Sequence, residues 1–158
     1  MRREIGPAIY RASRETGINP QLIAAVIWQE SRANPFAIRY EPKFFDRYIK
    51  GKELTGFVPS FKLISEETER ASRAMSFGLM QVMGATAREN GFEGTYLSEL
   101  CDIQANIEIG VKILAKHIRK FEDTNKALLA YNGGGNKDYP LEVMEHIQSG
   151  DYQNVILL

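Results

Sequence analysis

The sequence contains one cysteine, two histidines, no excess of either charge and no long hydrophobic run, and each shortage excludes something. The lone Cys101 cannot form an internal disulfide and argues against a thiolate metal cluster. Twenty basic and twenty acidic residues cancel, which removes any general electrostatic attraction to nucleic acid or to an anionic membrane. No segment approaches the roughly 20 apolar residues that a membrane-spanning helix needs. We therefore expect no disulfide, no nucleic-acid partner and no membrane span.

The histidines and the glycine-rich run give no sign of a metal or a cofactor. His117 and His146 are far apart without the spaced ligands of a metal site, and each is predicted to lie on a helix surface. The acidic residues lack calcium-loop spacing, and the glycines at 133–135 are not followed by the lysine and hydroxyl residue of a phosphate-binding loop. The sequence thus predicts neither a metal site nor a cofactor.

Length and composition indicate one globular domain. The 158 residues suffice for a hydrophobic core, and 44% hydrophobic with 25% charged residues is ordinary for a globular protein. We expect a single domain over residues 1–158, acting as a monomer. The start, MRREIGPAIYRAS, is positively charged but has no following apolar run, so it does not look like a secretory signal peptide.

Hydrophobic periodicity predicts a mostly α protein. Helices are expected over residues 3–16, 20–33, 42–49, 65–73, 79–91, 102–121, 125–131 and 140–148. Strand signals are limited to a possible small hairpin near residues 49–63, because no sustained alternation occurs. Residues 36–73 carry seven aromatic side chains. They indicate either a small satellite core under a long loop, which we favour, or a wall of rings against which sugars stack.

One carboxylate is out of place on the helix predicted over residues 20–33. Asn19 suits its N-cap and Pro20 its first turn. At about 100° per residue, the apolar side chains sweep an arc roughly 140° wide, formed by Leu22, Ile23, Val26 and Ile27. Glu30 falls near the middle of that arc, where burial would raise its pKa toward that of a general acid working near neutral pH. The alternative is a helix end leaving the core, with Glu30 in solvent or paired with a base such as Arg32.

Two short segments combine glycine with polar residues. In Gly78–Gln81, sequence GLMQ, the Gln81 amide either satisfies buried backbone groups or contacts a ligand. In Ala130–Gly134, sequence AYNGG, the glycines either end a helix or let a ligand approach the backbone beside Tyr131 and Asn132. Each segment alone leaves both interpretations open.

Taken together, Glu30-Ser31, Gly78–Gln81 and Ala130-Tyr131-Asn132-Gly133 resemble the ordered motifs of the soluble lytic transglycosylases. These are peptidoglycan-cleaving enzymes with a goose-type-lysozyme-like fold. The flanking residues are also similar, namely INPQLIAAVIWQES before the acid, MQVMGATA after the glycine, and the register of Asn106, Ile107, Gly110 and Leu114. The resemblance covers residues 17–36 and 72–135.

Three features depart from that family pattern. Gly133 stands where the family more often has alanine, and Gly84 stands where it usually has proline. Residues 37–71 form an atypical insertion, longer than the family spacing between the ES and GLMQ motifs. We expect this insertion to build a distinct substrate wall or a lid.

The resemblance implies a mechanism and a set of site residues. Glu30 would protonate the oxygen that links N-acetylmuramic acid to N-acetylglucosamine, and would then act as base on the sugar's own C6 hydroxyl. That hydroxyl closes a 1,6-anhydro ring, so no water is consumed. Tyr131 would hydrogen-bond or orient Glu30 as the second catalytic residue. Substrate-binding positions implied by the motifs are Ser72 or Ser76, Gly78, Met80, Gln81, Tyr131 and Asn132.

Two other functions fit the same residues. A goose-type hydrolase needs an acidic residue to activate water, and Glu41 and Asp46 are its candidates. A non-catalytic cell-wall-binding or structural module, for example in a phage tail or secretion machine, would not need Glu30 at its apolar position. The expected partner is the peptidoglycan glycan strand, in the periplasm or cell wall. Because no signal peptide is recognised, we expect delivery by a phage, by secretion machinery or within a longer parent protein.

Overall fold

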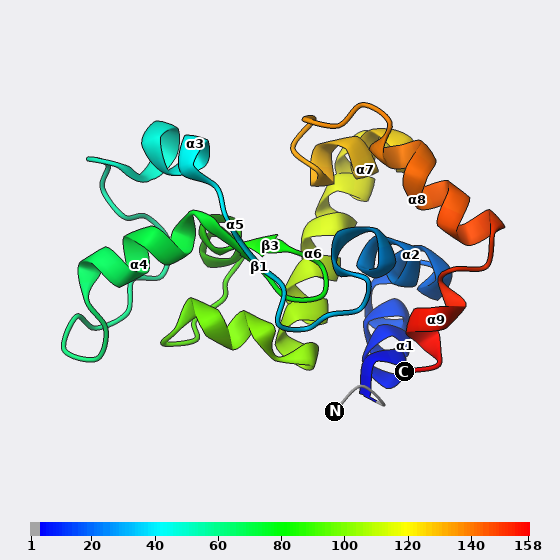
Figure 1. The fold of residues 1–158 in the computed structure, drawn as a ribbon, viewed down its shortest axis with the longest axis horizontal. Helices are drawn as coiled ribbons and strands as arrows, with labels where there is room; N and C mark the ends of the chain where they lie inside the picture. Colours follow the sequence, from blue (N-terminus) through cyan, green and yellow to red (C-terminus); the bar gives the residue numbers. More distant parts are fainter. Residues whose placement is uncertain (1–3) are drawn as a thin grey trace.

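The protein is mostly α with one small sheet, in a computed structural model that describes residues 4–158. Six helices gather on one side, and the sheet with the remaining helices forms a smaller part beside them (Figure 1). The helical side comprises α1 (Ile5–Thr16), α2 (Pro20–Ser31), α6 (Ile103–Phe121), α7 (Thr124–Tyr131), α8 (Tyr139–Gln148) and α9 (Gln153–Ile156). The smaller part comprises β1 (Ile38–Tyr40), α3 (Pro42–Phe44), η2 (Phe45–Ile49), α4 (Glu66–Arg73), β2 (Met75–Phe77), β3 (Val82–Met83), α5 (Gly84–Glu89) and η3 (Leu97–Cys101).

Helix α2 is the most deeply buried element of the helical side. The Asn19 side chain caps it by accepting from the Gln21 backbone N–H at 2.8 Å, as the sequence predicts. Six consecutive residues, Leu22 to Ile27, are buried because α1, α8 and α9 all pack against the helix. The burial is thus wider than the single predicted arc, and it brings the end of α2, with Glu30, to the edge of the core.

Helix α6 joins the two parts of the molecule. Asp102 caps it through the Ala105 backbone N–H at 2.9 Å, and its 19 residues match the predicted helix over residues 102–121. Its apolar side packs on α1 and α7, and the same helix contacts β3 and η3 of the smaller part. Figure 1 shows α6 running between α2 and the sheet.

The sheet has the antiparallel order β1-β2-β3. Ile38 lies opposite Phe77, and Ser76 lies opposite Met83. The hairpin predicted near residues 49–63 is wrong, since that stretch carries no strand. The real strands are two or three residues long, too short to show alternation, and β1 pairs with a strand more than thirty residues away.

The helix predicted from just after Gly78 to Gly91 is also wrong in its first half. Gly78 and Gln81 both have a left-handed backbone, with φ of 72° and 46°, which a right-handed helix excludes. Residues 78–83 therefore form a turn and the strand β3, and α5 starts only at Gly84. The apolar residues that suggested a helix are buried, but as a turn inside the core.

The other predicted helices are found within a few residues of their expected bounds. Residue 3, the expected start of the first helix, lies outside the described residues. The segment 42–49 is split into α3 and the π-helical turn η2, and Ser65 caps α4 through the Thr68 N–H at 3.1 Å, as expected. Among residues 4–158, no helix combines the length and the hydrophobicity needed to cross a membrane.

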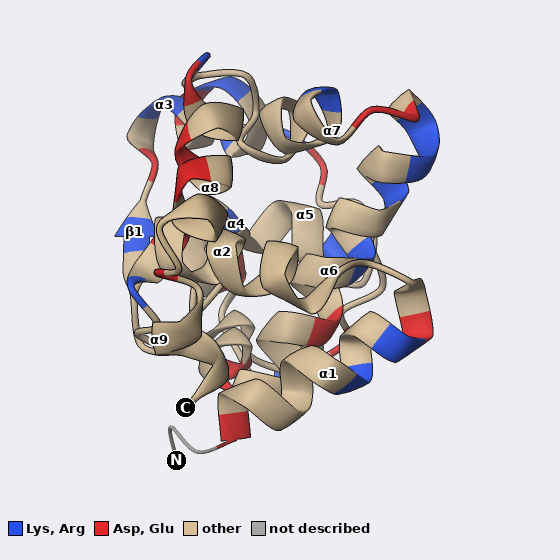
Figure 2. Cartoon of the chain, turned by 90° about the vertical axis from the view of Figure 1, so that its right-hand side faces the viewer, with Lys and Arg blue, Asp and Glu red and all other residues tan. Residues whose placement is uncertain are grey.

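The insertion at 37–71 contains the satellite core that we favoured. Ile49 is buried with Ala74 and Ala85, and Phe44 and Phe45 pack against them. Other aromatic residues of the segment are exposed, namely Phe36, Tyr40, Tyr48 and Phe61. Figure 2 shows the molecule from its helical side, where acidic residues mark α8 and α2 is almost free of charge.

Candidate active site

Glu30 lies in the last turn of α2, where the helix leaves the core. Its Oε1 accepts a hydrogen bond of 2.6 Å from the Tyr139 hydroxyl at the start of α8. Burial raises the pKa of the Glu30 carboxyl, and the Tyr139 hydrogen bond and the positive charge of Arg39 oppose that rise. Because burial is the largest of the three effects, Glu30 holds its proton more tightly than a surface glutamate does.

Glu30 faces a cleft of about 510 Å³, which we call the Glu30 cleft. Its walls come from both parts of the molecule, with β1, α3 and the sheet on one side and α6 and α7 on the other. The lining residues are Glu30, Arg39, Glu41, Phe44, Ser76, Gln81, Met83, Thr86, Ile113, His117, Ala130, Tyr131, Asn132 and Gly133. This volume is in the range of small-molecule and sugar-ring sites.

The Gly78–Gln81 turn is held against α2, α6 and α7 by side chains from each. The Ser31 hydroxyl donates to the Leu79 carbonyl oxygen at 2.8 Å. The Met80 N–H donates to Asn106 Oδ1 at 2.8 Å, and the Met80 carbonyl accepts from the Tyr131 hydroxyl at 2.8 Å. Three polar side chains that are far apart in the sequence, Ser31, Asn106 and Tyr131, therefore all bind the same turn.

Two glycines let this turn sit so deep. A Cβ at Gly78 would lie 2.6 Å from the Leu100 carbonyl oxygen and would also strain its left-handed backbone. A Cβ at Gly110 would lie 2.5 Å from Met80 Sδ. Gly110 thus lets α6 pack closely against the turn.

With this geometry described, comparison with known proteins identifies the family. The family model described as the transglycosylase SLT domain matches residues 7–140, which is most of the chain and includes Glu30 and Tyr131. The chain belongs to the transglycosylase SLT family. The fold is accordingly the mostly α, lysozyme-like fold that the motifs led us to expect.

A relative from the enterobacteria phage PRD1, named Transglycosylase, is 29% identical over 144 residues. The match covers 86% of this chain and 40% of the relative, so the chain spans less than half the length of that protein. No solved structure gives a significant match. The match thus identifies a transglycosylase SLT domain over most of the chain.

In this SLT domain, two tyrosines divide the role that the sequence gave to one. The Tyr131 hydroxyl has a single proton and donates it to Met80, so the hydrogen bond to Glu30 expected of Tyr131 comes from Tyr139 instead. Burial raises the pKa of both hydroxyls far above the usual range, and the nearby Glu30 adds to this. Both therefore remain protonated donors. Tyr139 was missed because it lies five residues beyond the AYNGG segment, in a stretch predicted only as the approach to a helix.

The remaining predicted site residues fall into two groups. Ser76, Gln81 and Asn132 line the Glu30 cleft, and the Ser76 hydroxyl donates to Gln81 Oε1 at 2.8 Å. Gln81 Nε2 in turn donates to two backbone carbonyls, those of Ala37 and Gly78. Ser72, Gly78 and Met80 do not line the cleft: Ser72 lies on α4, and Met80 is fully buried within the turn.

Of the two acidic candidates in the insertion, only one reaches the cleft. Glu41 lines it together with Arg39, and the Arg39 guanidinium is ion-paired with the Glu41 carboxylate. Asp46 is exposed, does not line the cleft, and lies 3.7 Å from Lys50 Nζ. The Glu30 cleft therefore holds a second carboxylate, and a cation accompanies it.

The two histidines are less peripheral than expected. His117 lines the Glu30 cleft, and its Nδ1 is buried without a hydrogen-bond partner among the described residues. Burial, with the positive charges of Lys116 and Lys120, lowers the pKa of His117. His146 bridges Asp151 and the Gln29 side chain, next to Glu30 in sequence. Within residues 4–158, no three His, Cys, Asp or Glu side chains come together as a metal site requires.

Several cleft residues were invisible to sequence reasoning. Phe44 comes from the insertion, Met83 from β3 and Thr86 from α5, and Ile113 and His117 come from α6. Helical spacing along α6 places Ile113 and His117 on one face, but only the arrangement of α7 and β1 turns that face toward Glu30. No motif in the sequence marks them.

Proposed function

We propose that this protein is a lytic transglycosylase that cleaves the β-1,4 bond between N-acetylmuramic acid and N-acetylglucosamine, leaving a 1,6-anhydro end. The observation that carries the proposal is the Glu30 carboxyl at the cleft wall, hydrogen-bonded by Tyr139, with its pKa raised by burial. A general acid near neutral pH needs such an elevated pKa.

In the first step, Glu30 gives its proton to the bridging oxygen while the bond from that oxygen to the muramic acid C1 breaks. The leaving sugar departs as an alcohol and positive charge develops at C1. The Glu30 carboxylate left behind is stabilised by the Tyr139 hydroxyl and by the positive charge of Arg39, both of which favour the charged form. The same contacts that oppose the pKa rise therefore assist the departure of the proton.

In the second step, the Glu30 carboxylate removes the proton from the C6 hydroxyl of the same muramic acid, and the C6 oxygen bonds to C1. Glu30 is protonated again, no water is consumed, and a single carboxyl serves as acid and then as base. Ordinary two-carboxylate glycosidases use a second acid to supply a nucleophile or to activate water. Here the substrate supplies the nucleophile.

The neutral polar groups of the cleft are suited to hold the sugar strand. Asn132 and Gln81 offer amides, Thr86 offers a hydroxyl, and Phe44 offers a ring face at the insertion side. Tyr131 acts through the Gly78–Gln81 turn, whose Met80 carbonyl it anchors. We propose that Tyr131 keeps the turn in place and that Tyr139 orients the acid.

Product mass tests the proposal. Purified cell walls are digested with the native chain and with Glu30→Gln, and the soluble fragments are weighed by mass spectrometry. The proposal expects anhydro-muramic ends, lighter than reducing ends by one water, from the native chain only. Equal release by the two chains would overturn the role of Glu30, and no release from either would support the non-catalytic cell-wall module.

A hydrolase is the second candidate, because Glu41 lies in the same cleft as Glu30. Activating water requires a free carboxylate base, and the ion pair with Arg39 engages this one. The two candidates give different products in the same assay. Reducing ends from the native chain, lost on Glu41→Gln, would establish the hydrolase and overturn the transglycosylase.

A further inference from the structure

A second cavity opens beside the Glu30 cleft, between η2 and α5. This η2–α5 cavity holds about 320 Å³ and is lined by Phe44, Tyr48, Ile49, Glu53, Leu54, Thr55, Arg73, Ala85, Thr86 and Glu89. Phe44 and Thr86 line both spaces. The cavity therefore adjoins the cleft at these two side chains, within reach of a substituent of a strand bound in the cleft.

The cavity combines an apolar wall with two carboxylates. Phe44 and Tyr48 pack at 4.9 Å between ring centroids, and Ile49, Leu54 and Ala85 add aliphatic surface. Glu53 and Glu89 are exposed, and neither forms an ion pair with a described residue. Such a wall accommodates a methylene chain, and the carboxylates attract a cation at its end.

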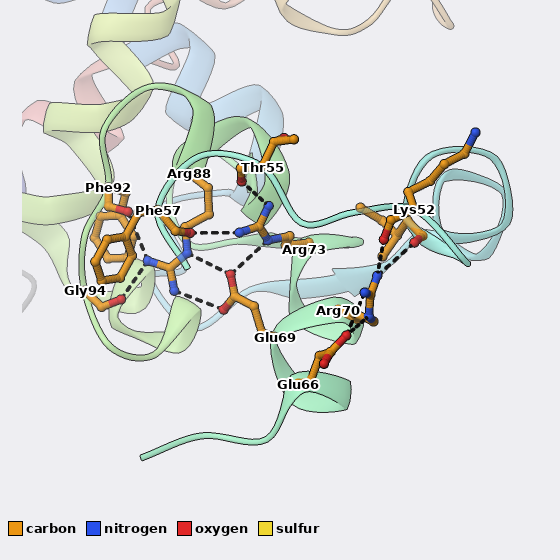
Figure 3. Close-up of polar contacts among 11 residues, drawn as sticks. Lys52, Thr55, Phe57, Glu66, Glu69, Arg70, Arg73, Arg88, Phe92 and Gly94 are labelled. Atoms are coloured by element: carbon orange, nitrogen blue, oxygen red, sulfur yellow. Dashed lines mark hydrogen bonds and ion pairs between the residues drawn. The ribbon is translucent and has the colours of Figure 1, made fainter. Parts of the chain in front are cut away.

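The one cation in the lining does not neutralise these carboxylates. Arg73 is 3% exposed, and its guanidinium donates to Glu69 Oε1 and to the carbonyl oxygens of Thr55 and Phe57. Figure 3 shows these contacts, with the guanidinium directed at the backbone. Arg73 thus serves as part of the cavity wall, and the charge of the cavity mouth is negative.

The wall is fixed before any ligand arrives. Arg70 donates to the carbonyl oxygens of Ile49 and Lys52. Together with the Arg73 contacts to Thr55 and Phe57, two arginines of α4 therefore hold the segment 49–57 by its backbone (Figure 3). Glu69 is shared between Arg73 and Arg88, all three buried, which ties this segment to α5. A binding site held in this way loses little conformational entropy when it is occupied.

We infer that the η2–α5 cavity binds the amine-bearing side chain of the peptide that branches from the muramic acid. The inference deepens the proposed function and rests on it, since a glycan strand in the Glu30 cleft is what brings the peptide to the cavity. The side chain's methylenes lie along Phe44 and Tyr48, and its ammonium group lies between Glu53 and Glu89. The insertion at 37–71 thereby makes the enzyme select strands whose peptides carry a free amine.

The test compares three preparations of the same glycan strands: with native peptides, with the peptide amines acetylated, and with the peptides removed by an amidase. For the native chain we expect kcat/KM on amine-bearing strands to exceed that on acetylated strands roughly five- to tenfold, the size that two exposed charge contacts supply. The double variant Glu53→Gln/Glu89→Gln should lose that preference and should cut stripped strands as the native chain does. Glu67→Gln/Glu93→Gln, the same charge change at exposed positions outside the cavity, should retain it.

The inference is overturned if the Glu53/Glu89 variant keeps the native preference, or if the native chain cuts acetylated and amine-bearing strands equally. If the Glu53/Glu89 variant also has a lower kcat/KM on peptide-free strands, the cavity binds sugar, and the inference is again overturned. Failure of the proposed function is separate, because binding needs no turnover. A disaccharide-tetrapeptide with a free amine, titrated calorimetrically onto Glu30→Gln, should bind five- to tenfold more tightly than its acetylated form even if no strand is cut.

Discussion

Glu30 and Glu69 are both withdrawn from solvent, but the groups that bind their carboxyls differ in charge. Glu30, on the helical side, is hydrogen-bonded by the neutral Tyr139 and has no ion-pair partner among the described residues. Glu69, in the smaller part, is fully buried and forms ion pairs with Arg73 and Arg88. Burial without a paired cation favours the protonated acid, whereas burial between two guanidinium groups favours the carboxylate. The charge of the bonding partner, more than the depth of burial, therefore separates a carboxyl suited to proton transfer from one that stabilises the fold.

The largest expected difference between the two glutamates comes from replacing Glu30, the carboxyl on the helical side. Glu30→Gln should lower the turnover of cell-wall strands by about 10³-fold, because an amide cannot transfer a proton and general acid–base catalysis contributes 10²–10⁴-fold. Its melting temperature should not fall, since the amide can still accept from Tyr139. Soluble product release and a thermal melt measure the two quantities. A variant that retains a tenth of the activity would contradict the role of Glu30.

The matching change in the smaller part should act on stability instead. Glu69→Gln leaves two buried guanidinium groups uncompensated, so the free energy of unfolding should drop by roughly 3–5 kcal/mol. Glu66→Gln is the control, because it removes the same charge from a partly exposed pair with Arg70 worth at most about 1 kcal/mol. Urea unfolding distinguishes them. Equal losses from the two variants would show that the buried network adds nothing special.

The neutral partner of Glu30 can be tested alone. Tyr139→Phe removes the hydrogen bond that favours the charged acid, so the pKa of Glu30 should rise further. The alkaline limb of the kcat/KM profile should move to higher pH, while kcat falls about tenfold because the departing proton leaves a less stabilised carboxylate. Tyr131→Phe, which disturbs the turn, should lower activity without this displacement. An unmoved limb in Tyr139→Phe would contradict the assigned contact.

The smallest expected effect is on stability as a function of pH. Because the folded pKa of Glu30 lies above its ordinary 4.5, the folded state binds the proton more tightly than the unfolded chain. The contribution of Glu30 to stability is therefore present below pH 4.5 and is lost as the pH rises through the raised pKa. Denaturation midpoints of the native chain and Glu30→Gln should diverge across that window, with the variant the more stable above it. Parallel curves would mean that the pKa is unshifted.

Much of the fold could be read from the sequence where local signals and packing agree. The Asn19 and Ser65 caps and the periodicity of residues 102–121 all led to helices that the structure contains. The helix expected over Leu79 and Met80 failed because hydrophobicity reports burial and not backbone geometry. There, Asn106 and Tyr131 hold the backbone in a turn, and both are distant in sequence.

The candidate site was predictable only as far as its residues carry motifs. Glu30, Gln81, Tyr131 and Asn132 were chosen in advance, and the structure gathers all four around one cleft. Tyr139 has no distinguishing sequence context, although it makes the shortest contact to the acid. Ser72 and Ser76 were equivalent by sequence, and the structure decides between them because Ser72 lies on α4 whereas Ser76 lies on β2 and lines the cleft.

The sequence by itself determined the helical class, the family and the choice of Glu30 as the candidate acid, because periodicity, caps and ordered motifs are properties of short stretches. Only the tertiary structure decided which tyrosine bonds Glu30, which second carboxylate reaches the cleft and what the insertion at 37–71 encloses. Those outcomes depend on contacts between residues that are far apart in the chain. The same glutamate side chain becomes an acid at position 30 and a fixed counter-ion at position 69 because folding brings a neutral hydroxyl to one and two arginines to the other.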